Sequence, residues 1–249
     1  KSGNYYGAIT EYKRILCFDP DNIKALEKLA NLERKSGNFE ASNKYLERLI
    51  ILNEDKSRII DHRIMQVSNL IKLNRFISAE IILDSLNESL EDEQKQTIML
   101  QKIMILSETG RINQALRTLA ELFPGSNLKP LWNRIKILRE QKIKPEEART
   151  LSSLIPGMGQ MTAGYWKEGI NGLILNSAIL YFLSTLYEKE NYTDLAFYSL
   201  ALNRYYFGTR EKAYQLAFNK NQNIDNLIVS LIKDFIRERL KIKRNIGNK

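Results

Sequence analysis

The sequence has almost none of the residues that enzymes use most often to bind metals or to activate a nucleophile. It contains one cysteine, Cys17, and one histidine, His62, among 249 residues. These two residues cannot form an internal disulfide or a zinc site with the usual set of cysteine and histidine ligands. The nucleotide-binding patterns GxGxxG and GxxxxGK[ST] and the metal-binding pattern HExxH are also missing. We therefore expect no enzyme and no bound cofactor or metal, with Cys17 in a core and His62 in a structural or surface role.

The two halves of the chain differ in charge. Residues 1–124 hold 18 Lys and Arg against 18 Asp and Glu, whereas residues 125–249 hold 20 against 11. Within the second half, the basic segments 129–149 and 204–249 flank residues 150–203, which carry two basic and four acidic side chains. Basic segments on both sides of an apolar, slightly acidic centre indicate contact with a membrane or with nucleic acid.

Residues 1–124 contain a repeat with a period of 34 to 37 residues. Each copy has a Gly or Asn suited to a left-handed turn, then a large apolar residue, then a small residue where two helices can approach closely. This pattern resembles the tetratricopeptide repeat in its period and residue types. The chain opens inside a repeat, so we expect the second helix of one repeat and then three whole repeats, with further chain upstream. The matching positions are Gly3, Gly37, Asn74 and Gly110 for the turn, Tyr5, Phe39, Phe76 and Ile112 for the large residue, and Ala8, Ser42, Ala79 and Ala115 for the small residue.

The resemblance implies a stacked helical array whose concave groove holds a partner protein or peptide. The first helix of each repeat lines such a groove. Members that hold a C-terminal carboxylate use Lys and Asn at set positions, and here Glu27 stands where that Lys belongs, so we do not expect that kind of ligand. The alternative is that these side chains only form a solvated face. The candidate groove residues are Lys24, Glu27, Asn31, Asp61, Met65 and Ser68.

A glycine-rich turn precedes the longest uncharged stretch of the chain. Residues 156–169, PGMGQMTAGYWKEG, end at Gly169, which also begins a stretch of 19 uncharged residues, 169–187. About twenty residues span a bilayer core. Tyr165, Trp166 and Tyr187 lie at the ends of this stretch, where aromatic side chains meet a membrane surface. Residues 195–208 are again apolar, with Arg204 among them. We interpret residues 150–217 as a membrane hairpin; no strand precedes the turn, so we do not interpret it as a phosphate-binding loop.

The turn and the two apolar segments together resemble the small bacterial membrane hairpins related to TM2 domains. The resemblance covers about seventy residues and departs from the family at Arg204. It implies a membrane-embedded pair of helices in an envelope protein. The positions that carry it are Pro156, Gly157, Gly159, Gln160, Gly164 and Gly169.

Taken together, the sequence predicts an all-α protein in four parts. These are an array of repeats (1–124), a basic helical joint (125–149), the glycine-rich turn with its hairpin (150–217) and an amphipathic basic tail helix (218–249). We expect an interaction scaffold anchored in the bacterial envelope, at the inner membrane, with lipid contacts through 150–217 and the basic tail. The tail could equally dock on the protein itself. The side of the membrane that holds the array, the oligomeric state and the identity of the partner stay open.

A second interpretation also stays open. The uncharged helix could be the centre of a soluble bundle, because polar residues such as Asn171 and Asn176 soften it. The protein would then be a soluble helical adaptor with a basic C-terminal face able to contact nucleic acid. We do not favour nucleic acid, because the sequence has no interleaved aromatic residues and no DNA-reading motif.

Overall fold

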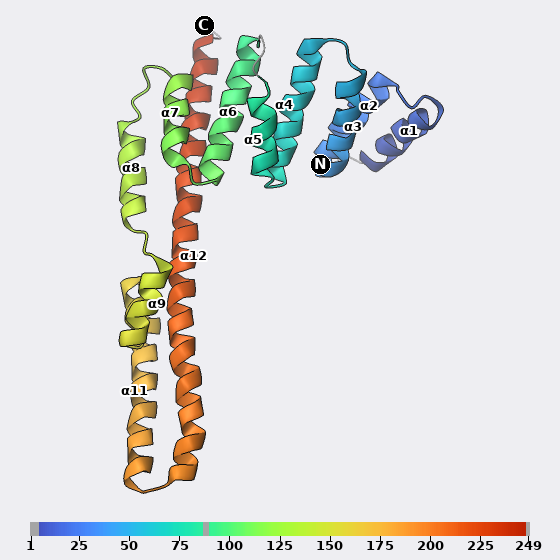
Figure 1. Cartoon of the computed structure of the whole chain (residues 1–249). Coiled ribbons are helices and arrows are strands. Elements are labelled where there is room, and N and C mark those ends of the chain that lie inside the picture. Colours follow the sequence, from blue (N-terminus) through green and yellow to red (C-terminus); the bar gives the residue numbers. More distant parts are fainter. Residues whose placement is uncertain (1–4, 87–89, 248–249) are drawn as a thin grey trace. The chain divides into compact units, whose positions relative to one another are not determined.

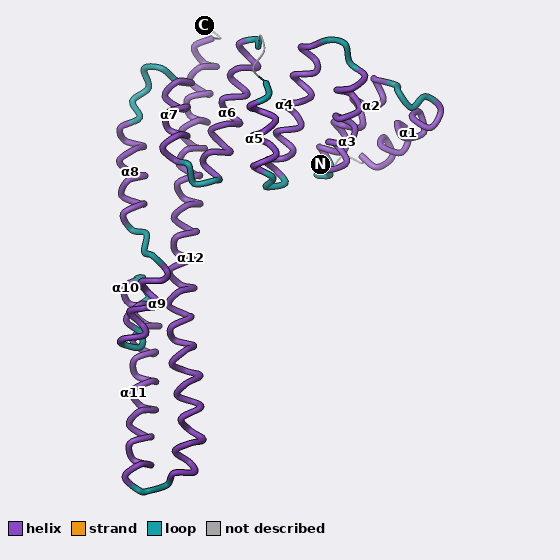
Figure 2. The backbone as a smooth tube through the Cα atoms, in the orientation of Figure 1, coloured by secondary structure: helices purple, strands orange, loops and turns teal. Residues whose placement is uncertain are grey.

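The computed structural model of the chain describes residues 5–86 and 90–247, which form helices and connecting loops. No β-strand occurs in these residues, which confirms the expected all-α fold class (Figure 2). The chain divides into two compact units, residues 1–127 and 128–249. We describe each unit by itself.

The first unit is a series of helices joined by short turns (Figure 1). Helix α1 is followed by three pairs, α2 with α3, α4 with α5 and α6 with α7, and the helices within each pair pack on each other. Each pair also packs on the helix before it. The bounds are α1 Tyr5–Phe18, α2 Ile23–Lys35, α3 Phe39–Leu52, α4 Lys56–Lys72, α5 Phe76–Asp84, α6 Asp92–Glu108 and α7 Ile112–Leu122.

The repeated residues of the sequence lie where the helix pairs need them. Gly37, Asn74 and Gly110 have positive φ angles of 88°, 57° and 75° in the turns within the three pairs. Only a residue that tolerates the left-handed region can end one helix and start the next so abruptly. The small residues Ser42, Ala79 and Ala115 are completely buried between helices. Gly3, the first turn position of the pattern, lies outside the described residues.

The core of the first unit runs between the paired helices. One cluster joins Leu26 and Ala30 of α2 to Leu46 and Leu49 of α3. A second, larger cluster joins α4, α5 and α6. Burial of such side chains contributes roughly 1.5–3 kcal/mol each, so each helix pair is stabilised chiefly by its immediate neighbours, as in other repeat architectures. The second cluster consists of Ile60, Ile64, Val67, Leu70, Ala79, Leu83, Leu86 and Ile105.

The expectation that Cys17 lies in a core is wrong. The thiol is free and exposed. Helix α1 packs against α2, and Ile9 is the residue of α1 that is buried. Cys17 lies near the C-terminal end of α1, between residues that are themselves half-buried or exposed, so its apolar neighbours in sequence do not create a core around it.

The second unit is built around one long helix. Helix α12, Tyr192–Gly247, is 56 residues long. Helices α8, α9, α10 and α11 pack along it in turn, and α11 forms an antiparallel hairpin with its first part (Figure 1). The expected second arm, 195–208, and the described part of the expected tail helix, 218–247, are therefore parts of a single helix. The other bounds are α8 Lys129–Glu140, α9 Pro145–Leu154, α10 Met158–Thr162 and α11 Trp166–Glu188.

The turn glycines of the first unit give a first testable prediction. Replacing Gly37 by Ala should lower the free energy of unfolding by about 1 kcal/mol, because a Cβ is unfavourable at a φ of 88°. Gly7 is the matched control. It lies inside α1 and a Cβ there meets nothing within 4 Å, so Gly7→Ala should raise the free energy by up to about 1 kcal/mol. Denaturant unfolding of the whole chain, followed by circular dichroism, measures both changes; equal effects of the two variants would contradict the assignment.

Candidate functional site

Residues 156–169, which we call the glycine joint, bring helix backbones into direct contact. Gly157 has a φ of 96°, and a Cβ on it would lie 2.0 Å from the carbonyl oxygen of Gly169. A Cβ on Gly159 would lie 1.8 Å from the carbonyl oxygen of Ala148 in α9. Neither position can accept a side chain unless a backbone moves. The glycines therefore fix how α9, α10 and α11 cross.

A buried glutamine holds the same crossing together. Gln160 is 1% exposed. Its side-chain amide donates to the carbonyl oxygen of Thr209 in α12 at 2.8 Å, and its side-chain oxygen accepts from the Ser152 hydroxyl in α9 at 2.7 Å. The Ser152 oxygen in turn accepts from the Gly159 backbone N–H at 3.0 Å. One amide side chain thus joins three helices, and the hydrogen bonds satisfy a polar group that would be costly to bury alone.

The hydrogen-bond chain continues into the hairpin. Asn176 of α11 is buried and donates to the Thr209 hydroxyl at 3.1 Å and to the Gly172 carbonyl at 2.7 Å. A Cβ on Gly172 would lie 3.1 Å from the Thr209 methyl group, so α11 and α12 approach each other closely here. Thr209 is therefore the residue of α12 that both the joint and the hairpin use.

The remaining motif residues end helices. Pro156 follows Leu154 and Ile155, where α9 stops. Gly164 has a φ of 91° just after α10. Lys220 of α12 donates to the carbonyl oxygen of Ala163 at 3.1 Å, which satisfies the C-terminal end of α10. The structure thus gathers all six residues of the PGMGQ motif at one crossing of helices.

The basic segment 129–149 is docked on α12 through side chains. Asn221 makes two hydrogen bonds to the backbone of Ile143, in the loop between α8 and α9. Lys142 pairs with Asp225 at 2.5 Å. Arg149 pairs with Glu211 at 2.8 Å and lies over the ring of Tyr214. Several positive charges of this segment are therefore matched by acidic residues.

The hairpin arms are apolar and largely uncovered. Helix α11 is long and apolar enough to span a membrane, and only 17% of its most apolar stretch is buried. Large side chains point outward on both arms. The two helices meet through a narrow seam that includes Leu183, Leu186 and an edge-to-face pair of Phe182 and Tyr198 at 5.1 Å. The exposed large residues of the arms include Ile170, Ile174, Leu180, Tyr181, Phe197, Leu200 and Phe207.

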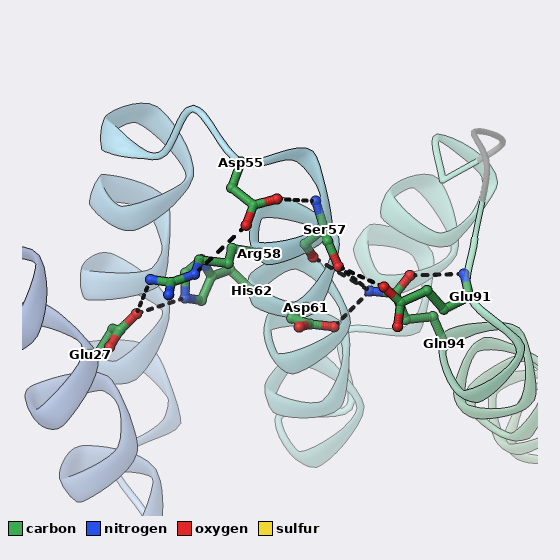
Figure 3. A network of polar contacts seen from close by, with 8 residues as sticks. All are labelled: Glu27, Asp55, Ser57, Arg58, Asp61, His62, Glu91 and Gln94. Carbon is green, nitrogen blue, oxygen red and sulfur yellow. Dashed lines mark hydrogen bonds and ion pairs between the residues drawn. The ribbon is translucent and has the colours of Figure 1, made fainter.

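In the first unit, a ladder of polar contacts connects α2, α4 and α6, which are the first helices of the three pairs (Figure 3). Glu27 of α2 lies 3.8 Å from Arg58 and 4.0 Å from His62, both of α4. Asp61 of α4 accepts a hydrogen bond from Gln94 of α6 at 2.9 Å. Burial lowers the pKa of His62 below its usual value, although Glu27 and Asp61 act in the opposite direction. His62 is 8% exposed, so it is a neutral, structural side chain near neutral pH.

The six candidate groove residues have different surroundings. Lys24 and Asn31 are exposed on α2, and Glu27 belongs to the ladder. Asp61 is also part of the ladder, and Ser68 accepts a hydrogen bond from Gln101 of α6. Met65 packs against the core between α2 and α3. They all lie on α2 and α4, but no single pocket collects them among the described cavities.

No protein-family model, curated protein or solved structure matches this chain. Three residues of this hydrogen-bond chain lie outside the glycine joint and were not singled out from the sequence for this role: Ser152, Asn176 and Thr209. They are ordinary polar residues in helices, separated by tens of positions, and no local pattern marks Ser152 and Thr209 as partners of Gln160 or Asn176 as a partner of Thr209.

Gly159 provides the second prediction. Gly159→Ala should destabilise the crossing by roughly 1–3 kcal/mol, because the new methyl group collides with the backbone of Ala148. Gly208→Ala is the control on α12, where a Cβ meets nothing within 4 Å. Thermal unfolding and limited proteolysis of the whole chain in mild detergent compare the two. A Gly159 variant as resistant as the Gly208 variant would mean that the backbones are not in contact.

His62 provides the third prediction. Because the pKa of His62 is lowered in the folded state, the unfolded chain binds the extra proton first. Stability is therefore unaffected by this group well above the unfolded pKa of about 6.5, and it decreases from there until pH falls through the lowered pKa of the folded state. His62→Gln should therefore lose less stability than the unchanged chain between about pH 7.5 and about pH 5.5. Denaturation midpoints at the two pH values test this, and parallel losses in both proteins would be the contrary result.

Proposed function

We propose that this protein is a membrane-anchored interaction scaffold of the bacterial envelope. The observation that carries the proposal is the exposure of the hairpin: a 23-residue apolar helix with 17% of its most apolar stretch buried. A helix of this length extends about 34 Å, against about 30 Å for the hydrocarbon core. In water, an apolar surface of this extent is unfavourable and promotes association.

The first part of α12 accompanies α11 through the same layer in this proposal. Residues 195–209 contain one charged side chain, Arg204. Tyr187 and Tyr192 stack edge to face at 6.5 Å at the tip, and Trp166 lies at the opposite end of α11, so aromatic residues mark both ends. The tip of the hairpin carries Glu188 at the end of α11 and Lys189 and Glu190 in the loop, and in this proposal it lies in the water on one side of the membrane.

The array of helix pairs supplies the interaction surface. We propose that it is a tetratricopeptide array, because the turn glycines, the buried small residues and the stacked pairs agree with the pattern. The exposed side chains of Lys24 and Asn31 are available to a partner protein or peptide, while Glu27 and Asp61 set the spacing of α2, α4 and α6. The glycine joint fixes the hairpin to the base of the second unit, so the membrane segment is rigidly attached there.

Membrane extraction is the fourth prediction. Membranes from cells that express the whole chain are washed with alkaline carbonate. We expect the protein to stay in the pellet and to dissolve only with detergent, because α11 and the first part of α12 contact lipid. Release into the supernatant would overturn the membrane proposal and favour the soluble adaptor, whose basic C-terminal half is then tested for nucleic-acid binding.

Sidedness is measured with the same material. The chain has a single cysteine, which is exposed, so Cys17→Ser gives a cysteine-free background. Lys189→Cys then places a thiol at the tip of the hairpin. An impermeant maleimide applied to intact cells and to opened cells reports which side holds the tip. Cys17 itself, in the unchanged chain, reports the side of the array.

A further inference from the structure

The hairpin contains a polar cavity that the anchor role does not require. The cavity has a volume of about 350 Å³ and lies between α11 and α12 on the side of the glycine joint. Arg204, Gly208 and Lys212 line it from α12, where a spacing of four residues puts them on one face. Glu168, Asn171 and Gly172 line it from α11 at similar spacing. This open hollow on an apolar hairpin therefore brings together two cations, one carboxylate and an amide, and the side chains of Arg204, Lys212 and Asn171 are exposed.

None of these charges is neutralised by the protein. Within the described part of the chain, the side chains of Arg204, Lys212, Glu168 and Asn171 make no hydrogen bond or ion pair with the protein. By contrast, Arg149, Lys142 and Arg111 elsewhere in the chain all have carboxylate partners. Unpaired ionised groups in a membrane segment are costly, and they face a cavity or a ligand when they are kept. The cavity thus presents a net charge of one positive unit to its contents.

Gly208 indicates that the space itself is useful. A glycine inside a helix is less favourable than alanine. A Cβ added at Gly157, Gly159 or Gly169 would lie within 3 Å of another backbone atom, so close packing explains why these three positions are glycine. A Cβ added at Gly208 would meet nothing within 4 Å. The missing side chain at Gly208 is not needed for packing. Gly208 lines the cavity, and a large side chain there would extend into the space between Arg204 and Lys212.

We propose that this cavity binds a phosphate group, supplied by the phosphodiester of an anionic phospholipid at the membrane surface next to the glycine joint. Arg204 and Lys212 donate charge-assisted hydrogen bonds to the phosphate oxygens, and one negative charge matches the net charge of the lining. Asn171 and Glu168 face the polar part of the headgroup beyond the phosphate. The acyl chains lie along the exposed apolar arms. The lipid source of the phosphate rests on the proposed membrane function, whereas the phosphate site does not.

The test uses the whole chain purified in neutral detergent, with native mass spectrometry as the readout of bound lipid. The probes are phosphatidylglycerol and diacylglycerol, which has the same acyl chains without a phosphate. Two variants change the site: Arg204→Gln with Lys212→Gln removes the cations, and Gly208→Leu fills the cavity without changing charge. Lys167→Gln is the matched control, since it removes a cation from the same end of α11 outside the cavity lining. Circular dichroism of each variant verifies that the helices are intact.

We expect phosphatidylglycerol to bind about tenfold more weakly to both site variants and unchanged to the control, because charge-assisted contacts are lost or blocked. Diacylglycerol should bind equally to all four proteins. Equal phosphatidylglycerol binding to all proteins, or an equal loss in Lys167→Gln, would overturn the proposal. Inorganic phosphate that displaces phosphatidylglycerol and depends on the same variants would support the phosphate site and identify a free phosphate as its source.

The two proposals fail separately. A chain that stays in carbonate-washed membranes but shows no variant effect on lipid binding keeps its anchor and loses the phosphate site. A chain that is released by carbonate loses the anchor, and the inorganic phosphate titration still decides whether the cavity binds phosphate.

Discussion

The second unit depends on backbone-to-backbone contact at the glycine joint. Gly157 lies against the carbonyl group of Gly169, and Gly159 lies against that of Ala148, at distances that leave no room for a methyl group. Contacts this close bring buried carbonyl and amide groups together away from water, and such groups need partners. Gln160 donates to the carbonyl oxygen of Thr209 in α12 and accepts from the hydroxyl of Ser152 in α9, and the Ser152 oxygen accepts from the backbone N–H of Gly159. The close approach of the backbones and the hydrogen bonds of the buried polar groups thus depend on each other, and either one would be unfavourable without the other.

Because these contacts fix the base of the hairpin, its two helices need to bury little of their own surface. Only Gly169, Asn176, Leu183 and Leu186 of α11 are buried, which is little for a helix of its length. In a water-soluble bundle a helix gains its stability by covering an apolar face. Here the faces stay open and the direction of the hairpin is set at its base instead. A surrounding of lipid would make the open faces favourable, and it would also strengthen the hydrogen bond between Asn176 and Thr209.

The sequence was a good guide where a physical requirement recurs at a fixed spacing. The turns at Gly37, Asn74 and Gly110 could be predicted because each needs a positive φ, and the buried positions of Ser42, Ala79 and Ala115 because each lies three residues after the large apolar residue. The hydrogen bond from Gln160 to Thr209 could not be predicted, because the two residues are 49 positions apart in the sequence. The continuity of α12 was also missed, because the sequence changes from an apolar arm to a basic amphipathic tail while the helix continues through both. Cys17 was misplaced because apolar neighbours in sequence do not make a core.

The glycines of the hairpin region show that one residue type serves two opposite purposes. Gly172 lets α11 approach Thr209 closely, and the methyl group of Thr209 fills the space beside it. Gly208 lies near Thr209 in sequence, but its missing side chain leaves a space that nothing fills. Gly172 allows the two helices to pack without water between them, whereas Gly208 leaves room for a polar group next to that contact. Because Arg204 and Lys212 flank Gly208 at a spacing of four residues, the unfilled space and the unpaired charges have a common explanation in a bound anion, whereas packing alone accounts for neither.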